Sequence, residues 1–336
     1  MAKVLVTGAG GYIGGALATL LRERGDEVVA LARSDAAAAA AAARGTEVVR
    51  GDVLDPAALD RAMGGCSLVY HVAGVNSHCP KDPQRLMRVN VDGTEQVVRA
   101  AARAGIGRVV FTSSAAAIGE ANGTVGHERS PHRGSYLSLY DRSKHEAERV
   151  AFAAGAETGV EVVALNPSSV QGPPRKGGNG AIIIAYLNGR LPAFVDTHVS
   201  IVDVQDVAAA HLLAAERGAA GQRYVLNGAT LPSIEALALV SSLAGVDDRV
   251  RMIPPRLARG VVTLADAAFR LRGKVSPICR ARVETILHGH RYDGSRAERE
   301  LGVRYTPPAE TFRRTIEWAV REGLVRRPLP RVARGA

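Results

Sequence analysis

A glycine-rich turn near the start of the chain constrains its fold more than any other feature. Lys3–Thr7 reads KVLVT, which is typical of a buried strand, and the sequence continues as Thr7-Gly-Ala-Gly-Gly-Tyr-Ile-Gly14 into apolar residues at helical spacing. A strand, a glycine turn and a helix in this order predict a dinucleotide-binding unit. Gly8 permits the tight turn, Gly11 lets the backbone approach a pyrophosphate, and Gly14 lets the helix pack closely on the strand.

The same alternation of strand and helix continues over the first 165 residues. Further strands are predicted at 27–31, 47–50, 67–71, 108–112 and 160–165, and helices at 12–24, 36–43, 56–63, 82–104 and 140–158. Strands separated by helices at this spacing favour right-handed parallel crossovers. The sequence therefore predicts an α/β fold with a doubly wound parallel sheet of the Rossmann type.

The pattern changes after residue 166, where turn-rich segments replace the regular alternation. We expect a dinucleotide-binding domain at 1–170, to which residues 198–225 return, and a smaller C-terminal α+β substrate lobe at 171–197 and 226–325. Residues 326–336 are expected to form a basic tail.

The formal charge of +10 is distributed unevenly along the 336 residues. Residues 1–250 hold 24 basic and 25 acidic side chains, whereas residues 251–336 hold 19 and 8, a net charge of +11. The segment with the glycine turn is thus nearly neutral, and the charge gives little support to nucleic-acid binding. It leaves open an anionic substrate, an anionic surface or simple solubility.

Composition and cysteine usage favour a cytoplasmic protein. Hydrophobic residues make up 46% of the chain, but no apolar run is long enough to span a membrane, and the start has no signal-peptide pattern. The three cysteines, Cys66, Cys79 and Cys279, cannot all pair and lack metal-ligand spacing. We expect three reduced thiols and no integral membrane segment.

The end of the second predicted strand carries the signal for cofactor choice. An acid at this place accepts the ribose 2′-hydroxyl of NAD, but here the segment reads Leu31-Ala-Arg-Ser34. Arg33 offers a planar fork for a 2′-phosphate, and Ser34 could add a hydroxyl. Asp35 is expected to cap the following alanine helix. NADP is therefore predicted over NAD, which stays the alternative.

A tyrosine and a lysine four residues apart predict proton-transfer chemistry. Tyr140-Asp-Arg-Ser-Lys144 opens a helical stretch, so both side chains share one helix face. A nearby ammonium lowers the pKa of a phenol and suits it to donate or take a proton. Ser114 follows a predicted strand and is placed to hydrogen-bond a substrate carbonyl, although Ser113 or Ser114 is also expected to cap the next turn.

Together these motifs resemble the extended short-chain dehydrogenases/reductases, the NAD-dependent epimerase/dehydratase family. The resemblance spans about residues 3–320. It rests on TGAGGYIG at 7–14, GDVLDP at 51–56, YHVAG at 70–74, VNVDGT at 89–94, FTSSAA at 111–116, YDRSK at 140–144, NPSSVQGP at 166–173, VDVQDVA at 202–208 and RYDGSRAERELG at 291–302. The pattern is closest to the dihydroflavonol-reductase and 3β-hydroxysteroid-dehydrogenase-like branch.

The resemblance implies roles for individual residues. Tyr140 would be the catalytic acid/base, Lys144 would bind the nicotinamide ribose and tune the phenol, and Ser114 would orient the carbonyl. The expected cofactor contacts are Thr7, Gly8, Gly11, Tyr12, Ile13, Gly14, Arg33, Asp52, Val53, Val72, Ala73, Gly74, Tyr140, Lys144, Pro167 and Ser169. Asn90 matches a partly structural asparagine, and Asp203 and Asp206 look like scaffold that caps a helix near 206.

These features predict an NADP-dependent oxidoreductase that interconverts a ketone or aldehyde and an alcohol. The expected substrate contacts are Asn76, His78, Ala115 and Gln171. Sugar-nucleotide dehydratases of the family usually carry an Asp-Glu pair where this chain has Ala115-Ala116, which argues against dehydration. A nucleotide-sugar 4-epimerase with tightly bound NAD and a non-catalytic cofactor-sensing protein stay alternatives. Family habit implies a homodimer through the helices at 82–104 and 140–158.

Three further interpretations concern side chains outside these motifs. His71 is expected to be a satisfied core histidine. His127, His132, His288 and His290 lack carboxylate or cysteine partners at ligand spacing, so no metal is predicted. The apolar residues Leu257, Val261, Leu264, Ala265 and Ala268 share one side of a helix at 254–271, which is expected to pack on the core. A lid over an apolar substrate and a membrane-surface contact are the alternatives for this helix.

Overall fold

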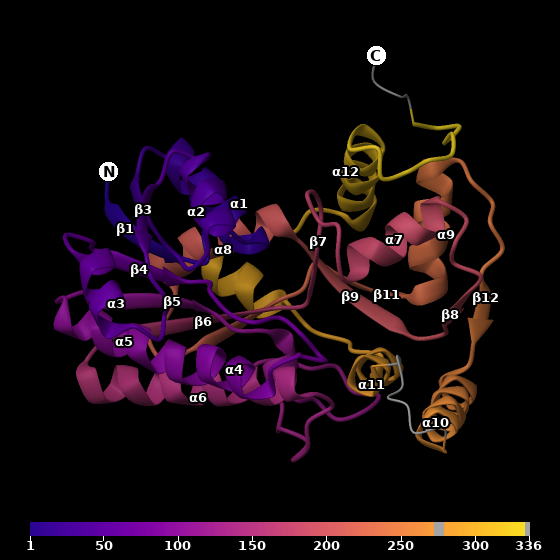
Figure 1. The fold of residues 1–336 in the computed structure, drawn as a ribbon, viewed down its shortest axis with the longest axis horizontal. Helices are drawn as coiled ribbons and strands as arrows, with labels where there is room; N and C mark the ends of the chain where they lie inside the picture. The colour runs from indigo at the N-terminus through magenta and orange to yellow at the C-terminus, as the bar shows by residue number, and fades with distance from the viewer. Residues whose placement is uncertain (272–278, 333–336) are drawn as a thin grey trace.

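A seven-stranded parallel sheet forms the larger part of the protein in the computed structural model (Figure 1). The structure describes residues 1–271 and 279–332, without the side chains of 179, 265–268 and 270. The strand order is β10-β6-β5-β4-β1-β2-β3, and every neighbouring pair is parallel. The strands are β1 (Lys3–Thr7), β2 (Glu27–Ala32), β3 (Glu47–Arg50), β4 (Leu68–His71), β5 (Arg108–Thr112), β6 (Glu161–Pro167) and β10 (Arg223–Leu226). The predicted doubly wound sheet is confirmed.

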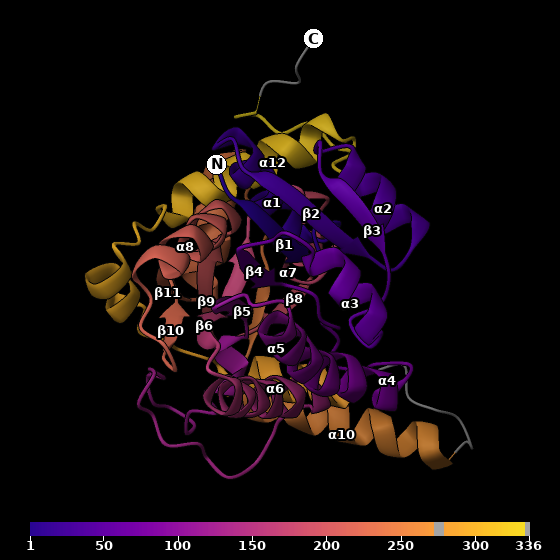
Figure 2. The ribbon, with the colours of Figure 1, turned by 90° about the vertical axis from the view of Figure 1, so that its left-hand side faces the viewer.

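Helices cover both faces of this sheet because successive residues of each strand point to opposite faces. Val4 and Val6 of β1 pack with the first group of helices, whereas Leu5 packs with the second. The first group is α1 (Tyr12–Glu23), α2 (Asp35–Ala42) and α8 (Val204–Arg217). The second is α3 (Pro56–Met63), α5 (Gly93–Arg103) and α6 (Leu139–Thr158). Helices α5 and α6 lie side by side (Figure 2), and dimerisation through them stays a prediction.

The predicted helix at 82–104 is interrupted by one wider turn. The structure has α4 (Pro83–Met87), the π-helical segment η1 (Arg88–Asp92) and α5 in direct succession. The wider turn contains Asn90, whose side chain bonds the backbone of Val75 and the hydroxyl of Ser143. Such turns occur often at functional sites. Periodicity alone cannot reveal it, because the partners of Asn90 come from other elements.

A second, smaller lobe lies at the right of Figure 1. Its strands form the sheet β11-β9-β7 and the pair β12-β8. The strands are β7 (Ser169–Gln171), β8 (Ala193–Val195), β9 (His198–Asp203), β11 (Ala229–Pro232) and β12 (Arg251–Ile253). Helices α7 (Asn179–Leu187), α9 (Ser233–Ala244) and α12 (Pro308–Arg321) share the core of this lobe. Helices α10 (Pro255–Leu271) and α11 (Arg280–His288) follow β12, whereas the π-helical η3 (Ala297–Leu301) packs on α8 and β10 of the larger part. The 3-10 segment η2 (Ala115–Ala117) follows β5.

The chain crosses between the two parts more than once. Strand β9 pairs within the small sheet, whereas α8 and β10 return to the large one. Asp203 caps α8 by accepting from the Gln205 amide and also accepts from Thr311 of α12. The predicted scaffold role of Asp203 is confirmed, although the helix it caps begins at Val204. The residue bounds predicted for the two domains stay a prediction.

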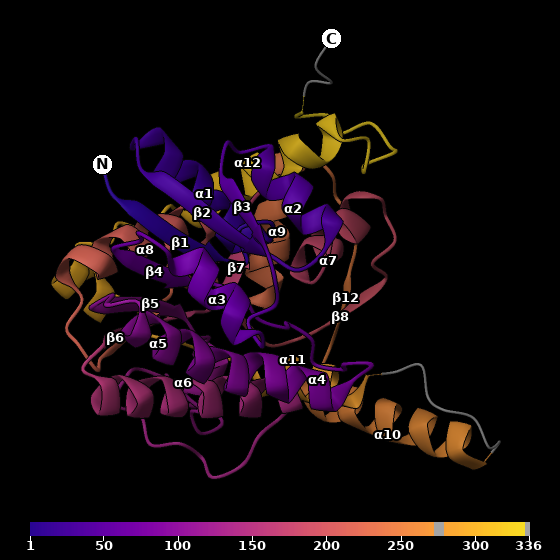
Figure 3. The ribbon, with the colours of Figure 1, turned by 60° about the vertical axis from the view of Figure 1, so that its left-hand side comes forward.

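Helix α10 departs from its predicted packing. The side chains of Leu257, Val261 and Leu264 are 63%, 63% and 73% exposed. The prediction that this face packs on the core is therefore wrong, because α10 packs on α11 through another face and projects from the body (Figure 3). The side chains of Ala265 and Ala268 lie outside the described ones. Among the described residues, no helix is both long and apolar enough to cross a membrane.

Candidate active site

The glycine turn lies where the strand order reverses, between β1 and β4. Gly8 has φ of +75°, and a Cβ there would lie 2.9 Å from the Ala73 amide nitrogen. A Cβ on Gly14 would lie 2.2 Å from the Gly8 carbonyl oxygen. Only glycine therefore fits at these two positions. Helix α1 begins directly after the turn, and its first amides have no carbonyl partner within the helix. This cradle fits the pyrophosphate of a dinucleotide, which binds at such a switch point.

Thr7 acts on this site through the neighbouring loop. Its side chain is fully buried, and its Oγ1 accepts from the amides of Val72 and Ala73 at 3.1 and 3.0 Å. Nδ1 of His71 lies 2.8 Å from the same hydroxyl, and Nε2 lies 3.0 Å from the hydroxyl of Thr94. Burial lowers the pKa of His71 to about 3. His71 is thus the satisfied core histidine that was predicted, and Thr7 fixes the loop that carries 72–74.

Arg33 and Asp52 come together at the ends of β2 and β3. The guanidinium of Arg33 lies 4.0 Å from a carboxylate oxygen of Asp52, and Arg85 lies 3.0 Å from the same oxygen. The Arg33 side chain is 56% exposed, so its fork is accessible from solvent. Arg85 was missed from the sequence because it lies on α4, far from both strands. The hydroxyl of Ser34, not Asp35, caps α2.

The predicted Ser-Tyr-Lys set is assembled at the carboxyl end of β5. Tyr140 is the second residue of α6 and is 8% exposed. Burial raises its pKa, which a hydrogen bond with Ser114 lowers in part. Ser114 follows β5 and caps η2 by accepting from the Ala116 amide at 3.2 Å. The Ser114 hydroxyl therefore caps the turn and contacts Tyr140, while its hydrogen bond to a substrate carbonyl stays a prediction.

Lys144 lies one helical turn after Tyr140 and is 6% exposed. Its Nζ donates to the Thr112 carbonyl at 3.0 Å and lies 5.3 Å from the centre of the Phe111 ring. A Cβ on Gly74 would lie 3.3 Å from this Nζ, so the ammonium sits beside the predicted cofactor path. Burial lowers the pKa of Lys144 to about 8, against the opposing charge of Glu148.

The first turn of α6 holds two polar residues that sequence reasoning missed. Ser138 caps the helix, accepting from the Asp141 amide at 3.1 Å and donating to the Asp141 carboxylate at 2.7 Å. Nδ1 of His78 lies 3.2 Å from the Ser138 hydroxyl, and its ring meets that of Tyr140 edge-on at 5.3 Å. The signal that could have found them is the Ser-x-x-Asp cap at 138–141, which contains Tyr140.

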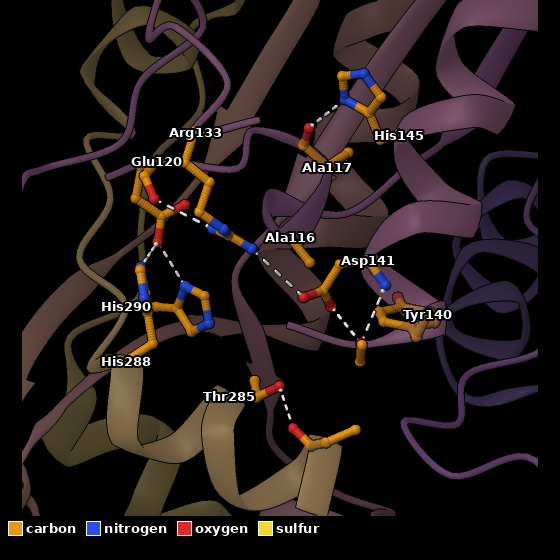
Figure 4. A network of polar contacts seen from close by, with 12 residues as sticks. Ala116, Ala117, Glu120, Arg133, Tyr140, Asp141, His145, Thr285, His288 and His290 are labelled. Carbon is orange, nitrogen blue, oxygen red and sulfur yellow. Dashed lines mark hydrogen bonds and ion pairs between the residues drawn. The ribbon is translucent and has the colours of Figure 1, made fainter. Parts of the chain in front are cut away.

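A buried cluster of polar side chains adjoins this turn (Figure 4). Oε1 of Glu120 lies 2.5 Å from Nδ1 of His290 and 3.3 Å from Nε2 of His288. Burial raises the pKa of Glu120, but the two imidazoles outweigh it and hold the pKa at about 2. Arg133 donates to the Glu120 carbonyl and lies 3.7 Å from Asp141. The statement that His288 and His290 lack a carboxylate partner is therefore wrong, since tertiary folding supplies Glu120.

The other predicted contacts divide into accessible and packed residues. Asn76 and Gly74 are exposed, and Pro167 and Ser169 lie where β6 meets β7. Ala115 packs with Ile118, Val225 and Tyr292, so its predicted contact with the substrate, which stays a prediction, would come from its backbone. Val53 is likewise buried, so any contact with adenine would come from its backbone. Gln171 donates to Ser169, while Tyr12 donates to the Gly172 carbonyl and Ile13 packs against the core.

Cys79 and Cys279 form a disulfide, which corrects the expectation of three reduced thiols. Their Cα atoms are 6.1 Å apart, within the range that a disulfide spans. The pair is separated by 200 residues, so no local spacing could reveal it. The bond joins the loop that carries His78 to the start of α11. Cys66 is buried and free.

The disulfide predicts a specific thiol count. Denatured, unreduced protein should show one reactive thiol per chain, and three after treatment with dithiothreitol. Cys279→Ser should lower the free energy of unfolding in urea by about 2–5 kcal/mol, because the long loop in the unfolded chain is no longer closed. The same comparison with dithiothreitol present is the control and should show no difference. Three thiols in the unreduced protein would contradict the pairing.

The comparisons with known proteins agree with this geometry. Residues 4–227 match the sequence profile of the NAD dependent epimerase/dehydratase family. The chain belongs to this family, the extended short-chain dehydrogenases/reductases. A dihydroflavonol 4-reductase-like protein of Synechocystis sp. is 32% identical over 330 residues, 96% of this chain and 95% of that protein. Cinnamoyl-CoA reductase 1 of Oryza sativa subsp. japonica is 35% identical over 263 residues, 71% of this chain and 75% of the relative.

A solved structure shares the whole fold. The crystal structure of gox2253 superimposes with a TM-score of 0.86 at 30% sequence identity, covering 97% of this chain and 100% of the other. The family and its branch are therefore as predicted, and the chain is an NAD(P)-dependent oxidoreductase of the extended type.

Proposed function

We propose that this protein is an NADP-dependent carbonyl reductase that interconverts a ketone or aldehyde and an alcohol. The observation that carries the proposal is the placement of Tyr140. Its buried phenol contacts Ser114 on one side, meets His78 on another and precedes the buried ammonium of Lys144 by one turn. The two relatives described above are named as reductases, which supports the same reaction class.

The residues that would hold the cofactor fit a dinucleotide phosphate. The glycine turn and the first amides of α1 would bind the pyrophosphate, and Arg33 would bind the 2′-phosphate. Lys144, beside Gly74, would contact the nicotinamide ribose. When bound, the cofactor supplies the hydride. Asp52 lies between Arg33 and Arg85 and would hold the two guanidiniums at the adenosine end.

The side chains would divide the remaining work. Ser114 would donate a hydrogen bond to the substrate carbonyl, and Tyr140 would give its phenolic proton to the same oxygen as charge develops there. The ammonium of Lys144 would stabilise the phenolate that remains. Asp141 and Ser138 would not contact the reacting atoms. They hold the first turn of α6 and the ring of His78 in place, and so would act as positioning residues.

A substrate panel tests this function directly. Purified protein should oxidise NADPH in the presence of a ketone, an aldehyde or a steroid ketone, with a net change in absorbance at 340 nm. Interconversion of UDP-sugars by protein that purifies with NAD bound, without net redox change, would instead establish the 4-epimerase. Absence of turnover together with tight NADPH binding would establish a cofactor-sensing protein.

Arg33 predicts the choice between the two cofactors. Arg33→Ser should raise KM for NADPH about 10- to 100-fold, because a charge-assisted hydrogen bond to phosphate contributes roughly 1.5–3 kcal/mol. KM for NADH should change little. Arg103→Ser is the matched control, since the Arg103 side chain is 50% exposed and pairs with Asp60 on α3. Equal KM changes for both cofactors would contradict the role of Arg33.

A further inference from the structure

The outward face of α10 carries a group of exposed apolar side chains. Leu257, Val261 and Leu264 are joined on this face by Leu271, which is 89% exposed. Within the described chain, four of the eight large apolar side chains that the structure exposes lie on this one helix. Isolated exposed apolar residues are ordinary, but several on one helix mark an interaction surface.

The four side chains form one stripe along the helix. Their spacing of four, three and seven residues places them within a narrow arc, since an α-helix advances about 100° per residue. Other residues of α10 face the body: Ala258, Val262 and Phe269 are half-buried, and Arg259 pairs with Glu284 of α11 at 3.1 Å. The stripe is thus free along its length, and it is the part of α10 that points away from α11.

The part of the sequence that contains the stripe is rich in basic residues. Residues 251–282 contain eight basic side chains, namely Arg251, Arg256, Arg259, Arg270, Arg272, Lys274, Arg280 and Arg282, and one acidic side chain, Asp266. Arg256, Arg280 and Arg282 are exposed in the described chain. Two copies that met through this face would bring these positive charges together, which disfavours self-association. An anionic surface would be attracted by the same charges.

We propose that α10 binds to an anionic lipid surface. The stripe would enter the boundary between headgroups and acyl chains, and the arginines would contact the phosphates, as amphipathic helices with these properties do. The helix would lie along the surface, because its 17 residues include charged side chains and do not form a spanning segment. The Cys79–Cys279 bond would connect this anchor, through α11, to the loop that carries His78.

Vesicle flotation tests the proposal on the full chain. The protein should float with vesicles of phosphatidylcholine and phosphatidylglycerol, and binding should fall about fivefold for Arg256→Ala, since one basic residue near such a surface contributes about 1 kcal/mol. The triple variant Leu257→Ser, Val261→Ser and Leu264→Ser should lose at least about tenfold in partitioning. Ile234→Ser is the matched control, because Ile234 is 55% exposed on α9, and it should bind like the unmodified protein.

A fluorescent reporter separates lipid contact from self-association. The protein has one tryptophan, Trp318, which is 5% exposed in the core of the small lobe, so Leu264→Trp adds the one signal from a surface position. Its emission should shift to shorter wavelength with anionic vesicles and stay unchanged without them at any protein concentration. Equal binding of the triple and unmodified proteins, no flotation, or a vesicle-independent shift that accompanies dimers in sedimentation would overturn the proposal. Unchanged NADPH binding by the triple variant would confirm that it is folded.

Discussion

Replacing Tyr140 with phenylalanine is expected to lower kcat by about three orders of magnitude, because the proton donor of the carbonyl reduction is removed. Tyr140 is 8% exposed, and phenylalanine keeps the ring that packs edge-on against His78. The variant should therefore stay folded. NADPH binding should survive, since the glycine turn and Lys144 are unchanged. The measurements are steady-state kcat with the best substrate of the panel and Kd for NADPH from fluorescence quenching.

Tyr136 offers a matched control in the same segment of the chain. It is 38% exposed, packs against His132 and His145 and does not contact Ser114 or Lys144. Tyr136→Phe should therefore keep the kcat of the unmodified protein. Turnover by Tyr140→Phe at an unchanged rate would refute the assignment of the proton donor, whatever the substrate proves to be.

Replacing Lys144 with methionine is expected to lower kcat at least about a hundredfold and to raise KM for NADPH. Methionine fills a similar volume but carries no charge to stabilise a phenolate. In the unmodified protein the rate of carbonyl reduction should fall as the pH rises through about 8, because Lys144 then loses its proton. A variant that retains full activity, or a pH profile without this fall, would contradict the role of Lys144.

Lys144→Met is expected to lower the activity of the protein but to raise its stability. The pKa of Lys144 lies at about 8 in the fold and at 10.5 for an ordinary lysine, so the unfolded chain binds more protons between these values. Stability of the unmodified protein should therefore rise with pH over this range, and the cost of the buried charge is fully present below pH 8. At pH 7, Lys144→Met should have a higher Tm than the unmodified protein, and this difference in Tm should decrease towards pH 10. A lower Tm of Lys144→Met at pH 7 would contradict this prediction, because the contacts of the ammonium would then outweigh the cost of burying its charge.

Local patterns predicted the strands of the large sheet and the residues of the Ser-Tyr-Lys set, whose catalytic roles stay a proposal. The glycine turn, the strands β1 to β6 and the residues Ser114, Tyr140 and Lys144 each depend on residues that are close in sequence or at fixed positions after a strand. Parallel strands bring their carboxyl ends to one edge, so motifs at those ends meet without further information. For this reason the sequence alone predicts that these motifs lie close together.

The contacts that tune the site were beyond the reach of these patterns. Asn90 joins Val75 to Ser143 through a π-helical turn, and Arg85 meets Asp52 across 33 residues. Glu120 meets His290 across 170 residues. Their partners are set by how helices pack around the sheet, because a side chain finds its hydrogen-bond partner in space and not in sequence.

The sequence by itself determined the doubly wound sheet, the family and the Ser-Tyr-Lys set, because glycine turns and hydrophobic periodicity act over a few residues. The tertiary structure decided that Cys79 pairs with Cys279 and that the apolar side of α10 faces outward. Periodicity shows that a helix has an apolar side, but which neighbour covers that side depends on the whole fold. In this protein no described neighbour covers it, and the segment of the sequence that contains it, residues 251–282, carries eight basic side chains and one acidic one.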